Sequence, residues 1–420
     1  MPGVAQGRWT PSELGFTLAV EKKAMEYELR HNNDVVVVVS VNENFRVDRI
    51  SKPYINAEKL PVGLLQHDGQ NIDSHEFNEW ILSRGIPAKR ENADYIFDKE
   101  NVNSARELVF KNDGLSMTDH YWIVPKNSPL RWEDVNYFDN DIDFGKHGDA
   151  IYLGKNEEAV ADGRTPSSSA SGMQPKVWVI HENQRWMLKG SEVLTKQEPY
   201  SEVIASLFLE KLNIEHVCYN LVERDGETLS GCPNMLDNRH ELISAFYVSN
   251  NKRGNNESVY EHYICSCQNL GVKGDIRTLL EQMIAVDYLI ANIDRHWSNF
   301  AVIRNTDDFS DVCLAPLYDH GAAFYTKLHH LEIESKNRYL ECRSFKRKQS
   351  DNIKLVRNVD WLDRDALKDL PDLTFEILSK NKFNPPNRVD IIVGSIRNRI
   401  EEFKRAMGFS FDAPVSVSVK

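Results

Sequence analysis

The stretch NIDRHWSNFAVI at positions 292–303, together with LAPLYDHG at positions 314–321, decides the expected fold. Asp294 precedes Asn299 by five residues, and Asp319 stands two residues before a glycine. Apolar residues that predict strands follow Asn299 and precede Asp319, and a polar turn separates the two strands. This order is typical of enzymes that transfer a phosphoryl group from ATP: first an Asp, then an Asn, a hairpin and a second Asp.

Phosphoryl transfer needs a carboxylate that accepts or orients the proton of the substrate hydroxyl, and hard oxygen ligands for Mg²⁺. We assign the first role to Asp294 and the metal to Asn299 and Asp319. Each residue taken singly is equally well a helix-end, turn or surface residue, but the ordered set in its strand context favours catalysis. For His296 a hydrogen bond that orients the loop backbone is the expected role.

The sequence upstream and downstream of these motifs predicts both strands and helices. Alternation from Lys176 to Leu188 predicts a two-stranded hairpin that ends at Lys189. Residues 34–47, which contain a run of valines, predict a strand or hairpin. Amphipathic spacing of apolar residues predicts helices at 76–84, 200–212, 278–291 and 387–407.

We therefore predict an α+β chain in which a small N-terminal α+β module precedes a two-lobed, protein-kinase-like fold with a β-rich N-lobe and a helical C-lobe. The predicted boundaries are 1–150 for the N-terminal module, 165–247 for the N-lobe and 248–420 for the C-lobe. Small and polar residues at 154–172 indicate a linker or mobile loop between module and lobes. The hinge that contacts adenine is expected within 241–249.

Composition limits the partners and the compartment. The net charge is −12, from 51 Lys and Arg against 63 Asp and Glu, so direct binding to nucleic acid or anionic membranes is not expected. The six cysteines show neither zinc-site spacing nor a disulfide framework. Residues 1–15 lack the pattern of a signal peptide, and no apolar run is long enough to span a membrane. We expect a cytoplasmic protein.

Five segments resemble the HipA-like Ser/Thr kinase family, whose toxin members pair with an antitoxin repressor, over about 150 residues. Looser similarity includes LPVG at 60–63 and GLSMTDHYWI at 114–123, in a leader that differs from that of the toxins. The five segments are SGMQPK (171–176), WMLKG (186–190), EPYSEVIAS (198–206), ANIDRHWSNF (291–300) and APLYDHGAAF (315–324).

The resemblance implies a kinase that uses ATP and Mg²⁺, with Asp294, Lys189 and Glu202 as the catalytic set. Lys189 would contact the α- and β-phosphates, and Glu202 would hold it in an ion pair, with Glu198 as the alternative partner. A small-residue loop lets backbone N–H groups approach phosphate oxygens. The residues implied to bind the nucleotide are Ser171, Gly172, Met173, Gln174, Lys176 and Lys189.

The resemblance also implies a protein substrate, a possible small antitoxin or repressor partner, and a possible role as a toxin or as a stress or defence effector. Autophosphorylation of a serine in the phosphate loop would repel the phosphates of ATP. A plain solvated turn explains the same serines equally well. The candidate serines are Ser167, Ser168, Ser169 and Ser171.

Two alternatives stay open at this stage. Asp-Arg-His at 294–296 also resembles phosphoinositide kinases, and residues 327–357 hold nine basic side chains against four acidic ones. Together they would suit a lipid or small-molecule kinase. The second alternative is a nucleotide-binding regulatory scaffold without turnover.

Overall fold

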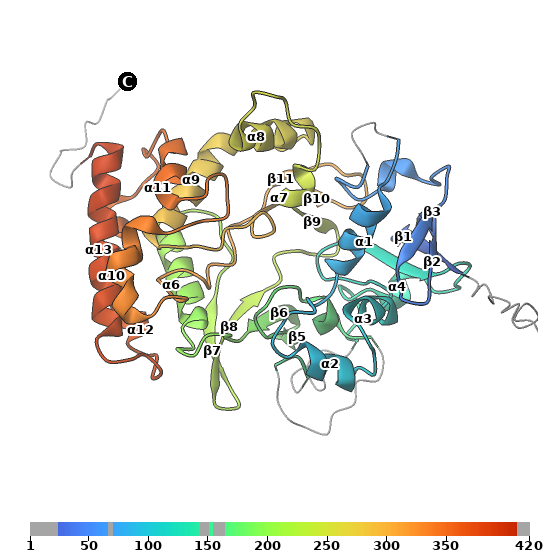
Figure 1. Ribbon diagram of the computed structural model, residues 1–420, viewed down its shortest axis with the longest axis horizontal. Helices are drawn as coiled ribbons and strands as arrows, with labels where there is room; N and C mark the ends of the chain where they lie inside the picture. The colour runs from blue at the N-terminus through green and yellow to red at the C-terminus, as the bar shows by residue number, and fades with distance from the viewer. Residues whose placement is uncertain (1–23, 66–69, 143–150, 154–163, 410–420) are drawn as a thin grey trace, which may run out of the picture.

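A computed structural model describes residues 24–65, 70–142, 151–153 and 164–409. Within these ranges the strands form three antiparallel sheets, with strand orders β3-β2-β1-β4, β5-β6-β8-β7 and β11-β10-β9. The molecule is elongated, with the C-terminal helices at one end and the N-terminal sheet at the other (Figure 1). The other two sheets lie between these ends (Figure 1).

The N-terminal sheet confirms the predicted hairpin, because the valine run forms β2 and turns back into β3. Helix α1, which begins after the N-cap Asp73, packs the buried side chains of Phe77, Trp80 and Ile81 into the core that lies on this sheet. The elements of this region are β1 (Met25–His31), β2 (Asp34–Val41), β3 (Val47–Ile50), η1 (Ala57–Lys59), α1 (Ser74–Leu82), α2 (Ala93–Lys99), α3 (Ala105–Lys111), β4 (Tyr121–Pro125) and α4 (Trp132–Val135).

The second sheet confirms the predicted hairpin ending at Lys189. Its turn residues Glu182 and Asn183 both have positive φ, which suits a two-residue turn between twisted strands. Helix α6 packs against β8 and carries the expected apolar stripe. The elements are η2 (Pro166–Ser169), β5 (Lys176–His181), β6 (Gln184–Lys189), α6 (Glu198–Lys211), β7 (Asn220–Arg224) and β8 (Glu227–Pro233).

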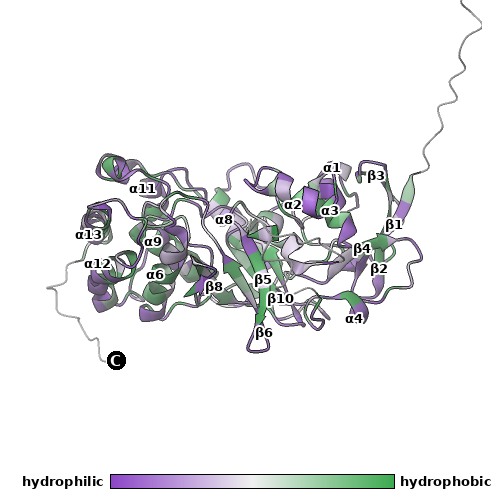
Figure 2. Ribbon diagram, turned by 90° about the horizontal axis from the view of Figure 1, so that it is seen from below, coloured by the Kyte–Doolittle hydropathy of each residue, from purple (hydrophilic) through white to green (hydrophobic). Residues whose placement is uncertain are grey.

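The third sheet and the C-terminal helices complete the fold, and α6 and α9 lie between the strands and the outer helices α12 and α13 (Figures 1 and 2). Helix α13 ends at Gly408, whose left-handed φ of 71° closes the helix as expected. The elements are β9 (His240–Ser244), α7 (Ala245–Val248), α8 (Val259–Asn269), α9 (Ile276–Leu289), β10 (Ala301–Asn305), β11 (Cys313–Leu314), η3 (His330–Glu332), α10 (Ile333–Lys336), η4 (Asn337–Tyr339), α11 (Gln349–Asn352), η5 (Ile353–Leu355), α12 (Arg364–Leu378) and α13 (Arg388–Met407).

The expectation of a linker or mobile loop at residues 154–172 is wrong for residues 166–169. Residues 154–163 lie outside the described residues, but residues 166–169 form a buried 3₁₀ turn rather than a mobile loop. The serine hydroxyls are satisfied locally, since Ser168 Oγ donates to the Thr165 carbonyl and Ser167 Oγ accepts from the Trp178 N–H. Small polar residues can be buried when each one finds such a partner. The domain boundary placed here stays a prediction.

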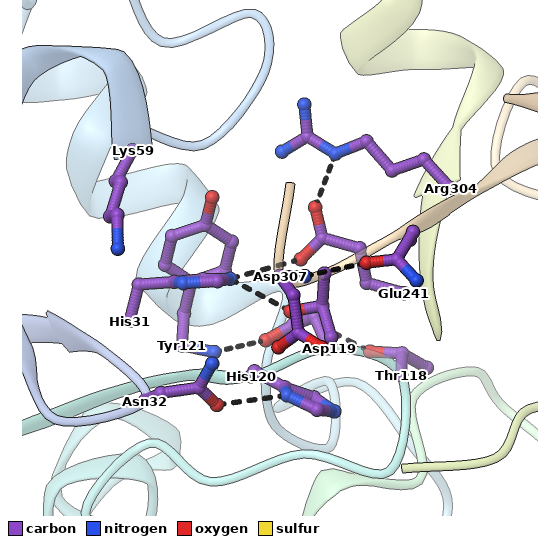
Figure 3. Close-up of polar contacts among 12 residues, drawn as sticks. His31, Asn32, Lys59, Thr118, Asp119, His120, Tyr121, Glu241, Arg304 and Asp307 are labelled. Atoms are coloured by element: carbon purple, nitrogen blue, oxygen red, sulfur yellow. Dashed lines mark hydrogen bonds and ion pairs between the residues drawn. The ribbon is translucent and has the colours of Figure 1, made fainter. Parts of the chain in front are cut away.

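The N-terminal sheet is joined to the third sheet by buried polar contacts (Figure 3). His31 Nε2 on β1 lies 3.6 Å from a carboxylate oxygen of Glu241 on β9 and 3.0 Å from the Thr306 hydroxyl. Arg304 on β10 donates to the same carboxylate at 2.5 Å. Because these side chains are buried, the contacts fix the N-terminal module against β9. In the described ranges, no helix is both long and apolar enough to cross a membrane.

Gly63 provides a test of this junction. It has a φ of +80°, and a Cβ at this position would overlap the carbonyl of Tyr247 on α7. Gly226, in the β7–β8 turn, has the same φ of +80° but no atom within 4 Å of such a Cβ. We expect Gly226→Ala to lower the free energy of unfolding by about 1–2 kcal/mol through backbone strain alone. Gly63→Ala should cost about 1–3 kcal/mol more because of the overlap.

Denaturant unfolding of the two variants checks this expectation. Equal losses in both variants would show that Gly63 does not lie against α7.

Candidate active site

A cavity of about 870 Å³ lies where the second and third sheets meet the loop after α9. Lys189, Asp294, Asn299 and Asp319 all line it, although they come from three separate segments of the chain. The structure therefore brings together the residues that the sequence motifs single out.

Lys189 is at the centre of the polar contacts in this cavity. Its ammonium group donates to Glu202 Oε1 at 2.9 Å, to Asp319 Oδ1 at 3.0 Å and to the Tyr219 hydroxyl at 3.1 Å. These three contacts use all three donors of the ammonium group. Glu198, the alternative partner, instead accepts hydrogen bonds from the Ser191 hydroxyl and the Glu192 N–H.

The charges of this cluster depend on one another. Burial opposes a charge on Lys189, but the Asp319 and Glu202 carboxylates outweigh burial and raise its pKa well above the ordinary value. Burial likewise opposes ionisation of Asp319, yet Lys189 and then Lys176 lower its pKa below the usual range. Burial raises the pKa of Glu202 in spite of Lys189. One ammonium group therefore pairs with two carboxyl groups, of which Glu202 is buried and Asp319 is partly exposed.

Asp319 has an unusual backbone. Its φ is 61°, a left-handed conformation that non-glycine residues adopt rarely. The flanking residues hold it in place, because the His320 N–H donates to Glu202 Oε2 at 2.7 Å and the Tyr318 carbonyl accepts from Arg295 at 2.6 Å. Strain of this kind persists where the surroundings determine the conformation, and it is common at functional sites.

Arg295 is a residue whose importance the sequence motifs did not reveal. Its buried guanidinium pairs with both carboxylate oxygens of Asp287 on α9, at 2.9 and 3.0 Å. The remaining end donates to the carbonyls of Asn299 and Tyr318. Arg295 thus ties α9, the loop 294–299 and the Asp319 segment together. The one available signal was an acidic residue inside a predicted apolar helix.

The loop 294–299 is organised by its own hydrogen bonds. The Asn299 amide donates to the Asp294 carbonyl at 2.9 Å, so its side-chain oxygen is the ligand atom that this contact leaves available. His296 Nδ1 accepts from the Ser298 N–H, the backbone role expected for it, and burial lowers its pKa. The Asp294 carboxylate itself lies 3.1 Å from Arg343 and 3.7 Å from Lys327.

The predicted phosphate loop also lines the cavity, through Ser171, Gly172, Met173, Gln174 and Lys176. Gly172 has a φ of +98°, and a Cβ there would lie 2.7 Å from the Lys176 ammonium. That ammonium donates to the Ser171 carbonyl at 2.8 Å. Burial lowers the pKa of Lys176. Glycine at 172 therefore allows the lysine to fold back under the loop.

The four serines proposed for autophosphorylation differ in exposure. Ser171 is exposed and lines the cavity, whereas Ser167, Ser168 and Ser169 are buried in η2. Ser169 Oγ donates to the Pro166 carbonyl. Ser169 also borders the cavity, but Ser171 is the exposed member of the set in this conformation.

Among the described residues, no group of three or more His, Cys, Asp or Glu side chains could hold a metal ion by itself. Asn299 and Asp319 offer an amide and a carboxylate oxygen, both hard ligands. Such a pair suits a cation that takes its other ligands from phosphate and water.

Comparison with known proteins follows this geometry. The model of the HipA-like C-terminal domain matches residues 168–370, and none of the curated proteins matches the chain. HipA of Shewanella oneidensis MR-1, solved with HipB and its operator DNA, is 12% identical with a TM-score of 0.51 and covers 91% of this chain and 98% of its own.

Two further solved structures have lower TM-scores. The Helicobacter pylori proinflammatory kinase CtkA is 15% identical, with a TM-score of 0.44 over 56% of this chain and 93% of its own. Choline kinase LicA from Streptococcus pneumoniae is 11% identical, with a TM-score of 0.19 over 56% of this chain and 91% of its own. Residues 168–370 therefore form a HipA-like C-terminal domain, and the likeness to the HipA structure shows a two-lobed, kinase-like fold.

Proposed function

We propose that this chain is an ATP- and Mg²⁺-dependent serine/threonine protein kinase. The observation that carries the proposal is the convergence of Lys189, Asp294, Asn299 and Asp319 on one cavity. A carboxylate for the acceptor hydroxyl, a fixed cation for the phosphates and two hard oxygen ligands are the parts that phosphoryl transfer needs.

Each residue has a role in this proposal. Asp294 orients the acceptor hydroxyl and takes its proton, while Lys189 contacts the α- and β-phosphates. Glu202 positions Lys189 through the 2.9 Å ion pair. The loop from Ser171 to Lys176 covers the phosphates with its backbone N–H groups.

Asn299 and Asp319 would hold Mg²⁺. Their fit to the ion rests on the donor set, since an amide oxygen and a carboxylate oxygen line the same cavity and nearby lysines hold the pKa of Asp319 below its usual range. Bound Mg²⁺ would neutralise the negative charge of the β- and γ-phosphates.

One of the two features that favoured the lipid-kinase alternative is weakened. Arg295, the Arg of the Asp-Arg-His motif, is buried in an ion pair with Asp287 and is not available to a head group. A scaffold without turnover would not need Lys189, Asp294 and Asp319 to line one cavity, so the kinase is the simpler account.

The setting of the activity is also part of the proposal. HipA of Shewanella oneidensis was solved in complex with HipB, and by analogy we propose a small repressor-like protein partner for this chain. A cytoplasmic location and a role as a toxin or stress effector accompany that proposal. Direct binding to nucleic acid is not proposed, because the net charge is −12.

Transfer of labelled phosphate from ATP tests the assigned carboxylates. We expect Asp294→Asn and Asp319→Asn to lower transfer to a protein mixture by about 100-fold or more, because the first loses the acceptor for the proton and the second loses a metal ligand. Chelation of Mg²⁺ should abolish transfer by the wild type. Asp311→Asn, at an exposed carboxylate in the β10–β11 turn, is the control.

Wild-type rates in both site variants would contradict the proposal. Transfer to lipid vesicles in place of protein would favour the lipid-kinase alternative.

Nucleotide affinity tests Lys189 separately from the chemical step. We expect Lys189→Met to weaken ATP binding by about 10- to 100-fold, since a charge-assisted hydrogen bond to phosphate is lost. Glu202→Gln should have a smaller effect, because the ammonium keeps its charge and its contact with Asp319. Isothermal titration calorimetry measures both affinities, with Lys211→Met, at an exposed ion pair with Asp369, as the control. Unchanged affinity in Lys189→Met would place the nucleotide elsewhere.

A further inference from the structure

A short turn at residues 341–348, named here the basic turn, lies against the loop that carries Asp294. Its ends pair through an antiparallel bridge between Glu341 and Lys348, and the Cys342 N–H donates to the Arg347 carbonyl at 2.7 Å. Arg343 stands near the tip of this turn. None of the roles proposed above requires the turn.

Aromatic packing fixes the position of the basic turn. Phe345 is buried, with its ring centroid 5.5 Å from that of Trp297 and 5.7 Å from that of Phe300, both in or directly after the loop 294–299. Just beyond the turn, the Gln349 side chain donates to the Asn292 carbonyl at 2.5 Å. The turn is therefore packed on the loop, and Arg343 lies beside Asp294.

Arg343 and Lys327 place two cations beside the Asp294 carboxylate. Arg343 Nη1 lies 3.1 Å from Asp294 Oδ1, and its side chain is 68% exposed. Lys327 lies 3.7 Å from Asp294 Oδ2 and 3.4 Å from Glu192, and is 38% exposed. Exposed pairs of this kind add little to stability, so folding alone does not explain them.

A guanidinium has five N–H donors in one plane. Arg343 can hold Asp294 with Nη1 and still present other donors to a carboxylate that arrives with the substrate. Lys327 adds a second positive charge on the opposite oxygen of Asp294. An acceptor hydroxyl at Asp294 would therefore have positive charge on both sides.

We infer that Arg343 and Lys327 select protein segments in which the acceptor serine or threonine lies next to acidic side chains. This inference rests on the kinase proposed above and names its substrate class. An acidic segment suits the site better than a polyanion such as RNA or an anionic membrane, because the whole chain carries a net charge of −12 and Glu192 lies beside Lys327.

Peptide phosphorylation by the full chain tests the inference. The probes are three serine peptides that differ only in the residues flanking the serine, which are Glu, Ala or Lys. We expect the Glu peptide to exceed the Lys peptide in kcat/KM by about tenfold. Arg343→Glu should reverse the order, because the guanidinium becomes a carboxylate that repels Glu and attracts Lys. Lys354→Glu makes the same charge change at an exposed site paired with Asp351 and should keep the wild-type order.

The outcomes separate the inference from the proposed kinase. Equal kcat/KM for the three peptides in the wild type, or a preference for Lys, would overturn the inference and leave the kinase intact. A requirement for RNA or for phosphoinositide vesicles would overturn it in favour of a polyanionic substrate. No transfer to any probe, with ATP binding absent as well, would instead contradict the kinase. The comparison of wild-type kcat/KM for the Glu and Lys peptides tests the inference even if Arg343→Glu does not fold.

Discussion

The ammonium group of Lys189 is the contact on which the site depends. It joins the end of β6 to α6 through Glu202 and to the segment after β11 through Asp319. Strand β6 belongs to the second sheet and β11 to the third, so this one side chain links the two sides of the cavity. Because Glu202 is buried, removing the ammonium would leave its carboxyl group without a charged partner, a costly arrangement in a protein interior.

A second set of contacts holds the opposite wall. Arg295 links α9 to the loop 294–299 and to the strained backbone at Asp319, and the basic turn rests on the same loop through Phe345. The N-terminal module continues this wall, since the Thr118 carbonyl accepts from the Leu242 N–H on β9 at 2.8 Å. The module is thus part of the structure around the cavity.

Much of this architecture was predictable because it is local in the sequence. Strand alternation at 176–188 and the valine run at 34–47 identified hairpins. Apolar periodicity identified α6, α9 and α13, and each predicted helix end lies within two residues of the observed one. The site residues were predictable for a different reason: the chemistry requires Asp, Asn and Asp in a set order around a hairpin.

The features that were missed depend on distant partners. Arg343 reaches Asp294 from 49 positions away, so no short pattern marks that contact, and Asp287 meets Arg295 because α9 ends between them. The segment 166–169 was expected to belong to a linker or mobile loop because of its small and polar residues. Its hydroxyls instead find partners that include the Trp178 N–H on β5, which only the folded chain supplies.

The most direct test of the central claim is a crystal structure of the protein with Mg²⁺ and a non-hydrolysable ATP analogue. The account predicts a Mg²⁺ ion about 2.1 Å from an oxygen of Asn299 and from an oxygen of Asp319, with Lys189 contacting phosphate. A nucleotide bound outside the cavity, or a metal ion that neither residue touches, would contradict it.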